Sequence, residues 1–149
     1  RFVEIRGETL ARSRDAAELQ QAVRKMRQKM RDNLDKTGKG LFDPKQGRGG
    51  IADIEFMVQF AVLRWAAEYP ELTAWTDNIR LLETLERLHL MPGAMAADLT
   101  QAYKHLRAAY HRNALEETPG LVSEDHLTEE RDRVIAIWDA LMEAGLDAG

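Results

Sequence analysis

A glycine-rich segment with two basic side chains is the part of this sequence best suited to binding chemistry. It extends from Lys45 to Gly50 and leads into a segment that begins Ile51-Ala52-Asp53-Ile54-Glu55. The first N–H groups of a helix have no intrahelical acceptor and carry partial positive charge, so they favour a phosphate or a carboxylate. Glycine permits close approach, and Lys45 and Arg48 add mobile positive charge. The pattern is therefore compatible with an anion site, and a purely structural role of the glycines stays open beside it.

Asp53 and Glu55 raise a second hypothesis, a pair of carboxylates that holds a metal ion. Residues two apart on a helix diverge by about 200°, so this pair cannot hold one metal if the segment is helical. We expect one carboxylate to neutralise the helix start, and the other to reach into a cleft or to pair with an arginine such as Arg80. The structural alternative is that the glycines only let the chain enter a buried helix, whose first turn Asp53 caps.

The residues that other catalytic sites require are missing or wrongly spaced. The chain has no cysteine, which excludes disulfides, thiolate nucleophiles and cysteine-based metal sites. Its four histidines lack the spacing of a zinc site, and neither a Gly-x-Ser-x-Gly elbow nor a Gly-Lys-Ser/Thr phosphate loop is present. We expect no catalytic and no metal-binding residues in this chain.

Helical periodicity surrounds the glycine-rich segment on both sides. A helix is expected from Asp15 as N-cap, after a shorter helix, with an apolar face formed by Leu19, Val23, Met26, Met30 and Leu34. We interpret its opposite face as solvated, with anion binding as the alternative. That face carries Arg24, Arg27, Lys29 and Arg31. Residues 51–68 are apolar around most of the circumference and are expected to form the central helix.

Three more helices are expected after Pro70, which ends the central helix. The first has Thr76 as N-cap and ends at Met91-Pro92-Gly93, and the second runs from about residue 92 or 94 to 115, before Thr118-Pro119-Gly120. The third follows Thr128, which begins an approximate capping box. No strand is expected. The side chains expected along one side of the first of these helices are Ile79, Leu82, Leu85, Glu86 and His89. Those expected to face inward from the third are Val134, Ile137, Trp138 and Leu141.

These elements predict an all-α fold, an antiparallel bundle of five or six helices that forms one domain over residues 1–149. No apolar run approaches the roughly 20 residues that span a bilayer, so we expect no membrane partner. The absence of cysteine fits a reducing compartment, and we expect a cytoplasmic protein. The sequence begins at Arg1, from which we expect a fragment of a longer multidomain chain. Residues 24–48 carry a net charge of +6 and residues 115–149 one of −8. Because the acidic tail repels phosphates, nucleic-acid binding is an alternative that we do not favour.

Several stretches of the sequence form a family pattern. They are Val23 to Arg31, Lys45-x-Gly47-x-Gly49-Gly50-Ile51-x-Asp53-Ile54-Glu55-Phe56-x-x-Gln59, Phe60-x-Val62-Leu63-Arg64, Trp75-x-Asp77-Asn78-x-Arg80-x-Leu82-Glu83 and Pro119-Gly120-x-Val122-Ser123-Glu124-Asp125. Together they resemble glutamine synthetase adenylyltransferase, and specifically the C-terminal, adenylylating half of that enzyme. The helical domain of PII uridylyltransferase is a related alternative, against which the Ser-Glu-Asp ending argues.

The resemblance implies a helical domain that follows a nucleotidyltransferase domain, in a bifunctional enzyme that adds AMP to glutamine synthetase and removes it to regulate nitrogen assimilation. It implies ATP and Mg²⁺ as cofactors of that parent enzyme. The implied partners are glutamine synthetase, a PII signalling protein and the upstream nucleotidyltransferase domain. The catalytic signature of such enzymes, Gly-Ser or Gly-Gly followed at a distance by Asp-x-Asp on a strand, is absent here. We therefore expect the metal to be held outside this chain, and the isolated fragment to be inactive.

The resemblance also implies that the glycine-rich segment faces a nucleotide cleft and supports binding there. Lys45 and the amides of Gly49 and Gly50 would contact phosphates or ribose, while Asp53 would order the loop or contact the nucleotide. The implied nucleotide-binding residues are Lys45, Gly47, Gly49, Gly50, Asp53 and Glu55. The alternative is a non-catalytic docking or regulatory module, which contacts glutamine synthetase, a PII protein or its own catalytic domain without touching nucleotide.

Overall fold

The chain is described here by a computed structural model, which places the backbone of residues 2–113 and 120–143 and the side chains of residues 16–112 and 120–143. The α-helices are α1 (Phe2–Leu34), α2 (Ile51–Trp65), α3 (Asn78–Arg87), α4 (Gly93–Asn113) and α5 (Thr128–Trp138). The shorter elements are strands β1 (Leu41–Phe42) and β2 (Val122–Ser123), the 3₁₀-helix η1 (Pro70–Thr73) and the π-helix η2 (Asp139–Glu143). The predicted all-α class is confirmed.

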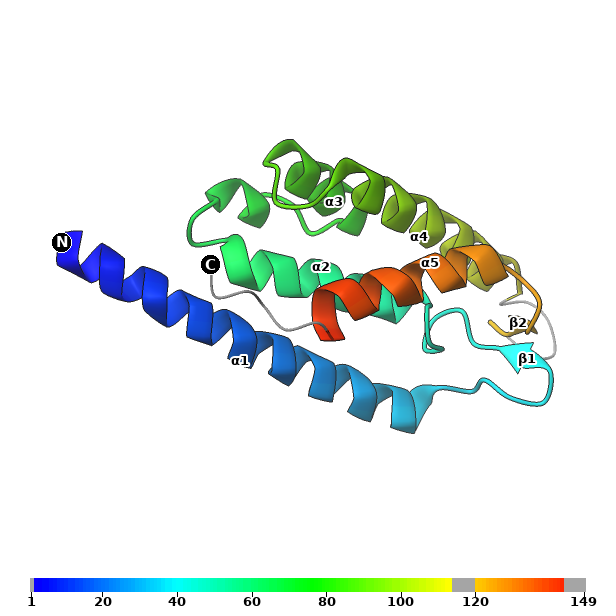
Figure 1. The fold of residues 1–149 in the computed structure, drawn as a ribbon. Coiled ribbons are helices and arrows are strands. Elements are labelled where there is room, and N and C mark those ends of the chain that lie inside the picture. The colour runs from blue at the N-terminus through cyan, green and yellow to red at the C-terminus, as the bar shows by residue number, and fades with distance from the viewer. Residues whose placement is uncertain (1, 114–119, 144–149) are drawn as a thin grey trace.

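α2 is the central helix, as its apolar circumference predicts. It contacts α1, α3, α4 and α5, and it runs antiparallel to α1, as α5 does to α4 (Figure 1). Each large apolar side chain in the core contributes roughly 1.5–3 kcal/mol through its removal from water. The core side chains with no exposed surface include Ile54, Met57, Leu82, Leu85, Leu99, Leu106 and Val134.

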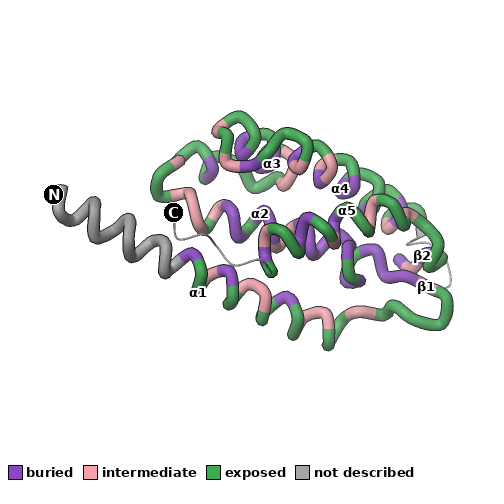
Figure 2. The backbone as a smooth tube through the Cα atoms, viewed as in Figure 1, coloured by how far each residue is buried: buried purple, intermediate pink, exposed green. Residues whose placement is uncertain are grey.

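α1 departs from its prediction in two ways. It is one continuous helix from Phe2, so the prediction of a separate shorter helix ending before an N-cap at Asp15 is wrong. Its orientation also differs, because Met26 is 63% exposed whereas the next residue, Arg27, is fully buried. Leu34, the last residue of the helix, is 49% exposed. In Figure 2 the described part of α1 shows a few buried positions separated by exposed and half-buried ones. The prediction that Arg27 lies on a solvated or anion-binding face is therefore wrong.

The boundaries of α3 follow from a cap that lies one residue later than predicted. Asp77, rather than Thr76, is the N-cap, and its side chain accepts the N–H groups of Ile79 at 2.8 Å and Arg80 at 3.4 Å. The helix ends at Arg87, and His89 lies beyond it with a φ of 61°. The predicted stop at residues 91–93 therefore falls too late, because the chain has already left the helix.

We expect the Asp77→Ala variant to unfold with a free energy lower by about 1 kcal/mol, as is typical when a side-chain N-cap is lost. The orphaned N–H groups of the first turn are exposed to water, which limits the effect. Urea denaturation of the 149-residue chain measures the change. Thr76→Ala is the matched control and should leave stability unchanged, whereas an equal loss in both variants would contradict this assignment of the cap.

The C-terminal part of the described chain corrects two further predictions. Leu127, in a left-handed conformation, is the N-cap of α5, so the capping box at Thr128 does not form. β2 pairs antiparallel with β1, with Leu41 opposite Ser123 and Phe42 opposite Val122. The prediction of no strand is thus wrong, although the sheet is very small. Val134, Ile137 and Trp138 are buried as predicted. The predicted helix end at residue 115 and the breaker at residues 118–119 lie outside the described residues.

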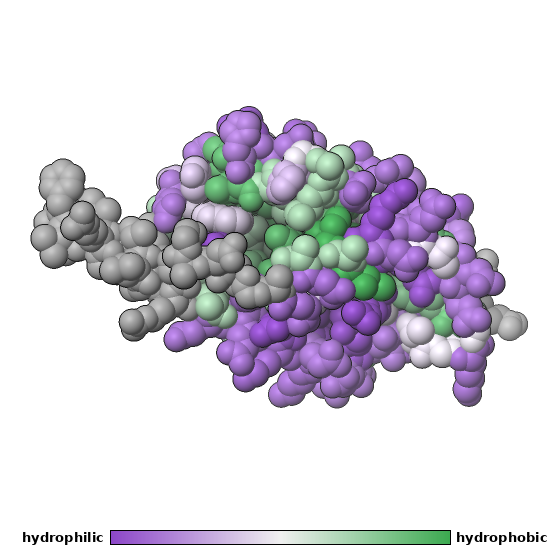
Figure 3. Space-filling view, in the orientation of Figure 1, coloured by the Kyte–Doolittle hydropathy of each residue, from purple (hydrophilic) through white to green (hydrophobic). Residues whose placement is uncertain are grey.

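The visible surface is divided between apolar and hydrophilic regions. On the face seen in Figure 1, apolar surface gathers across the middle of the molecule, and the side toward α1 is largely hydrophilic (Figure 3). Among the described residues, none of the helices combines the length and the apolar character needed to cross a membrane.

Candidate functional site

The segment between β1 and α2 is a turn organised by Asp43, which is only 6% exposed. One carboxylate oxygen of Asp43 accepts the backbone N–H groups of Lys45 and Gln46, both at 3.0 Å, and the other accepts that of Lys36 at 3.2 Å. Three backbone bonds to one carboxylate hold the turn in a single shape. Asp43 is absent from the predicted site, although an aspartate just before Pro44 is a turn signal.

The loop glycines lie where side chains do not fit. A Cβ at Gly47 or Gly50 would collide with the loop itself and, at Gly47, with the Phe42 ring of β1. Gly49 has a φ of 80°, and a Cβ there would lie 2.6 Å from the carbonyl oxygen of Arg131 on α5. Glycine at these positions lets the loop pack directly against β1 and α5. This geometry agrees with the structural interpretation of the glycines.

Asp53 is the centre of a buried charge network that joins α1, the loop and α2. One of its oxygens accepts from Arg27 Nε at 2.6 Å and from Arg31 Nη2 at 2.8 Å. The other accepts from the backbone N–H of Gly49 at 2.8 Å. Arg27 also donates through Nη2 to the carbonyl of Gln46 at 2.7 Å and through Nη1 to its side-chain oxygen at 3.3 Å. Asp53 therefore orders the loop, one of the two roles that the sequence left open.

This network changes the interpretation of the basic block. Arg27 and Asp53 are 0% and 1% exposed, and Arg31 is 18% exposed. Two of the positive charges of residues 24–48 thus share the single carboxylate of Asp53 and point into the protein, so they are less available to an outside anion than an exposed cation is. No sequence signal marks Arg27, because its partner lies on another helix. Its burial could be found only by placing α1 against α2.

The first two amides of α2 and those of the three loop glycines donate to protein oxygens. Gly50 N–H donates to the carbonyl of Gly47 at 2.9 Å, as Gly49 N–H does to Asp53. Ile51 N–H donates to the carbonyl of Pro44 at 2.8 Å, and the next amide donates to that of Lys45 at 2.9 Å. An anion could bind the Gly49 or Gly50 amide only by displacing these acceptors. The loop is preformed by its own hydrogen bonds.

The two cations of the loop have exposed side chains. Lys45 places its Nζ 5.8 Å from the centroid of the Tyr110 ring on α4, within the range of a cation–π contact. Arg48 lies 3.7 Å from Asp139, in a pair in which both side chains are more than half exposed. Such an exposed pair is weak. Lys45 and Arg48 are therefore the loop residues whose charge faces solvent.

Glu55 points away from Asp53, as the helical spacing predicts, and lines an open pocket of about 490 Å³ between α2, α3 and α4. The hydroxyl of Tyr103 donates to Glu55 at 3.4 Å and accepts from Asn78 Nδ2 and Arg107 Nη1, each at 3.2 Å. Lys104 also lines this pocket. Glu55 thus reaches a cleft, one of the predicted outcomes, while Arg80 pairs with Glu83 instead.

One face of α4 connects the lysine of the loop with the pocket at Glu55. Tyr103, Arg107 and Tyr110 are spaced four and three residues apart, so they share one side of the helix. Tyr110 contacts Lys45 and Tyr103 contacts Glu55. We call Tyr103, Arg107 and Tyr110 of α4, together with Lys45 and Glu55 that contact them, the α4 stripe. Neither tyrosine was singled out from the sequence, although this spacing within a helix is a usable signal.

Arg131 of α5 contacts β1 and the segment that follows β2. Its guanidinium stacks on the Phe42 ring at 3.6 Å from the centroid, and it donates to the carbonyl of Glu124 at 2.5 Å. The pKa of Arg131 is lowered, because burial lowers it more than the neighbouring carboxylates Asp132, Glu124 and Asp125 raise it. The Ser123-Glu124-Asp125 motif is thereby fixed beside β1, where its side chains remain exposed.

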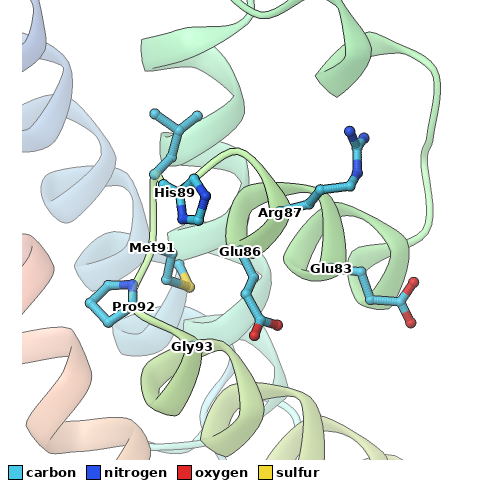
Figure 4. A pocket seen from close by; sticks show the side chains of 8 residues that line it. Glu83, Glu86, Arg87, His89, Met91, Pro92 and Gly93 are labelled. Carbon is cyan, nitrogen blue, oxygen red and sulfur yellow. The ribbon is translucent and has the colours of Figure 1, made fainter.

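A second pocket, of about 610 Å³, lies where α3 leads into α4. Glu86 points toward Gly93 at the start of α4, whereas Glu83 and Arg87 point away (Figure 4). No residue of the predicted site lines this pocket. Among the described residues, no group of three or more His, Cys, Asp or Glu side chains is arranged to hold a metal ion.

Comparison with known proteins places the chain in a family. The family model described as GlnD PII-uridylyltransferase matches residues 22–136. The chain is 46% identical, over 97% of its length, to a bifunctional glutamine synthetase adenylyltransferase/adenylyl-removing enzyme of Shewanella loihica, of which it covers 15%. It is 48% identical, over 94% of its length, to the enzyme of the same name in Pseudomonas aeruginosa, of which it covers 16%.

These relatives confirm the resemblance seen in the sequence motifs. The matches extend over nearly the whole chain, and the family model covers the loop, the charge network and the α4 stripe. The chain therefore belongs to the family described by the GlnD PII-uridylyltransferase model, as a segment related to the bifunctional glutamine synthetase adenylyltransferases.

Proposed function

We propose that this chain is one helical domain of a longer bifunctional adenylyltransferase, and that it packs against a nucleotidyltransferase domain of the same polypeptide and lines its nucleotide cleft. The whole cytoplasmic enzyme would add AMP to glutamine synthetase and remove it, under control of a PII signalling protein. ATP and Mg²⁺ would bind in that cleft, with the metal held by carboxylates outside this chain. The names of the relatives support this proposal.

The observation that carries the proposal is that Lys45 and Glu55 meet the same face of α4. A preformed loop fixes the backbone that carries Lys45, so only its side chain must be ordered, which lowers the entropic cost of binding an anion. The α4 stripe then offers a cation beside an aromatic ring at one end and a carboxylate at the other. A nucleotide has phosphates that suit the first and hydroxyl and amino groups that suit the second.

The six implied residues divide into two roles in this proposal. Gly47, Gly49, Gly50 and Asp53 give the loop its shape, because their backbone or carboxylate groups form hydrogen bonds within the loop or with the adjoining helices. Lys45 and Glu55 contact the nucleotide. This division replaces the expected amide contacts to phosphate with contacts from side chains.

Replacing Lys45 with alanine in the full-length enzyme tests the proposal. We expect kcat/KM for adenylylation to fall by about tenfold to a hundredfold, since a hydrogen bond to a charged group contributes about 1.5–3 kcal/mol. Lys25→Ala is the matched control, because Lys25 is an exposed lysine of α1 outside the loop. Equal kcat/KM values for the Lys45→Ala enzyme and the unmodified enzyme would contradict the proposal.

A docking module without nucleotide contact is the second candidate, and the occupied amides of Gly49 and Gly50 favour it. Calorimetry of the full-length enzyme with ATP and Mg²⁺ separates the two functions. Under the nucleotide proposal, Lys45→Ala weakens ATP binding. Under the docking alternative, ATP binds the Lys45→Ala enzyme as it binds the unmodified one.

A further inference from the structure

The hydroxyl group of Tyr103 connects three helices by hydrogen bonds, although Tyr103 is only 3% exposed. Its oxygen lies 3.2 Å from Asn78 Nδ2 of α3, 3.2 Å from Arg107 Nη1 of α4 and 3.4 Å from Glu55 Oε2 of α2. A hydroxyl group has one hydrogen with which to donate and two lone pairs with which to accept. Three partners therefore use all of its hydrogen-bonding capacity.

The chemistry of the three partners fixes the direction of each bond. A guanidinium group can only donate, and the amide nitrogen of Asn78 is also a donor, so these two groups occupy both lone pairs of Tyr103. The single hydroxyl hydrogen is left for Glu55, whose carboxylate can only accept. Because Asn78 and Arg107 set the direction of this hydrogen, they also help to set the position of the Glu55 carboxylate.

Glu55 keeps most of its own capacity for a ligand. A carboxylate can accept about four hydrogen bonds, and among the described residues Glu55 accepts one, from Tyr103. It is half-buried and lines the open pocket of about 490 Å³. Lys104 and Arg107 line the same pocket, and their positive charge offsets the repulsion that Glu55 would exert on an anionic ligand. The pocket therefore suits an O–H or N–H donor on a ligand that is anionic elsewhere.

Asn78 connects this network with the Trp75-x-Asp77-Asn78-x-Arg80 motif, which the glycine-rich loop does not explain. Asp77 caps α3 by accepting N–H groups of its first turn. Since the cap makes Asn78 the first residue of the helix, it also sets where the Asn78 amide lies relative to α4. Two adjacent residues of the motif thus start the helix and orient Tyr103.

We propose that Tyr103 is a positioning residue, which holds Glu55 so that the carboxylate accepts a hydrogen bond from a sugar hydroxyl or the base amino group of the bound nucleotide. This rests on the proposed function, in which Glu55 contacts the nucleotide. The bond from Tyr103 to Glu55 is the longest of the three, as is common where a site tightens only around its ligand. A network that only ties the three helices together is the alternative, and its loss would weaken the binding of every nucleotide equally.

Calorimetry of the full-length enzyme with ATP and three analogues tests this role. The analogues are 2′-deoxy-ATP, 3′-deoxy-ATP and purine riboside triphosphate, each of which lacks one candidate donor. We expect one of them to bind the unmodified enzyme about tenfold more weakly than ATP. In the Tyr103→Phe enzyme, which loses only the hydroxyl group, we expect that analogue to bind within about twofold of ATP. Tyr69→Phe is the matched control, because Tyr69 packs against the core outside this pocket, and it should keep the tenfold preference.

Asn78→Asp tests the direction of the bonds with the hydroxyl group of Tyr103 intact. The new carboxylate accepts where the amide donated, so it draws the hydroxyl hydrogen away from Glu55. Negative charge at the start of α3 is favourable, so this variant should fold. We expect it to lose the preference for ATP as Tyr103→Phe does. In a Glu55→Ala background neither change should alter the preference further, because both act through Glu55.

The remaining outcomes overturn the proposal in distinguishable ways. If Glu55→Ala abolished the preference for ATP and Tyr103→Phe retained it, the positioning role would be wrong and the nucleotide contact of Glu55 would stand. Equal binding of ATP and all three analogues to the unmodified enzyme would overturn both. The Lys45→Ala enzyme should bind ATP more weakly and keep its preference. Failure of the proposed phosphate contact and failure of the positioning role can therefore be observed separately.

Discussion

Replacing Asp53 with alanine lowers the free energy of unfolding of the 149-residue chain by about 3–5 kcal/mol, the range expected when one partner of a buried ion pair is removed. The variant leaves Arg27, which has no exposed surface, without its carboxylate. It also removes the acceptor of the Gly49 N–H. Urea denaturation, followed by helical circular dichroism, measures the loss as a shift of the midpoint.

An exposed ion pair of the same chain supplies the control for Asp53. Glu71 lies 3.6 Å from Arg87, and both side chains are about half exposed or more. Glu71→Ala should lower the free energy of unfolding by about 1 kcal/mol or less, because solvent screens such a pair. If Asp53→Ala and Glu71→Ala were equally mild, the buried network would not stabilise the loop.

Replacing Gly49 with alanine is expected to have the second largest effect, a loss of about 2–5 kcal/mol that combines left-handed strain with overpacking. The φ of Gly49 is 80°, and the added Cβ would lie 2.6 Å from the carbonyl oxygen of Arg131 and 3.1 Å from the side chain of Ile135. Backbone of α5 cannot move aside as a flexible side chain does. Denaturation in urea again measures the change.

Gly40 is a matched control for Gly49, because its φ is 79° but an added Cβ would meet no atom within 4 Å. Gly40→Ala should therefore show the backbone strain alone, about 1–2 kcal/mol. The difference between the two alanine variants isolates the packing of the loop against α5. Equal losses would mean that Gly49 is needed only for its conformation.

Local patterns predicted the elements of the fold well. The apolar circumference of residues 51–68 identified the central helix, and glycine and proline marked most of the connections. These signals depend on neighbours along the chain, so a single sequence carries them. Boundaries were less certain, as at Asp77, where two adjacent residues can each act as an N-cap.

The orientation of α1 could not be predicted in the same way. Periodicity favoured Met26 and Leu34 as inward residues, since apolar side chains are usually buried. Arg27 is buried instead because Asp53, 26 residues away, accepts a hydrogen bond from its Nε–H group. A contact of this kind is a property of two packed helices and leaves no periodic signal in either one. The exposure of Met26 is the consequence.

The candidate site was predicted in part. Spacing alone located the loop and showed that Asp53 and Glu55 point in different directions. The occupied amides of Gly49 and Gly50 were not foreseen, because they depend on acceptors contributed by the folded loop itself. The α4 stripe was missed as well, since Tyr103 and Tyr110 gain significance only through Glu55 and Lys45, which come from distant positions.

Chemical labelling of Lys45 tests most directly whether the preformed loop belongs to a nucleotide cleft. In the full-length enzyme, an amine-reactive acylating reagent modifies exposed lysines, and mass spectrometry compares each rate with and without ATP and Mg²⁺. We predict that nucleotide slows the labelling of Lys45 by about tenfold, while Lys25, on the outer side of α1, keeps its rate. Labelling of Lys45 that is the same with saturating nucleotide as without it would contradict the account.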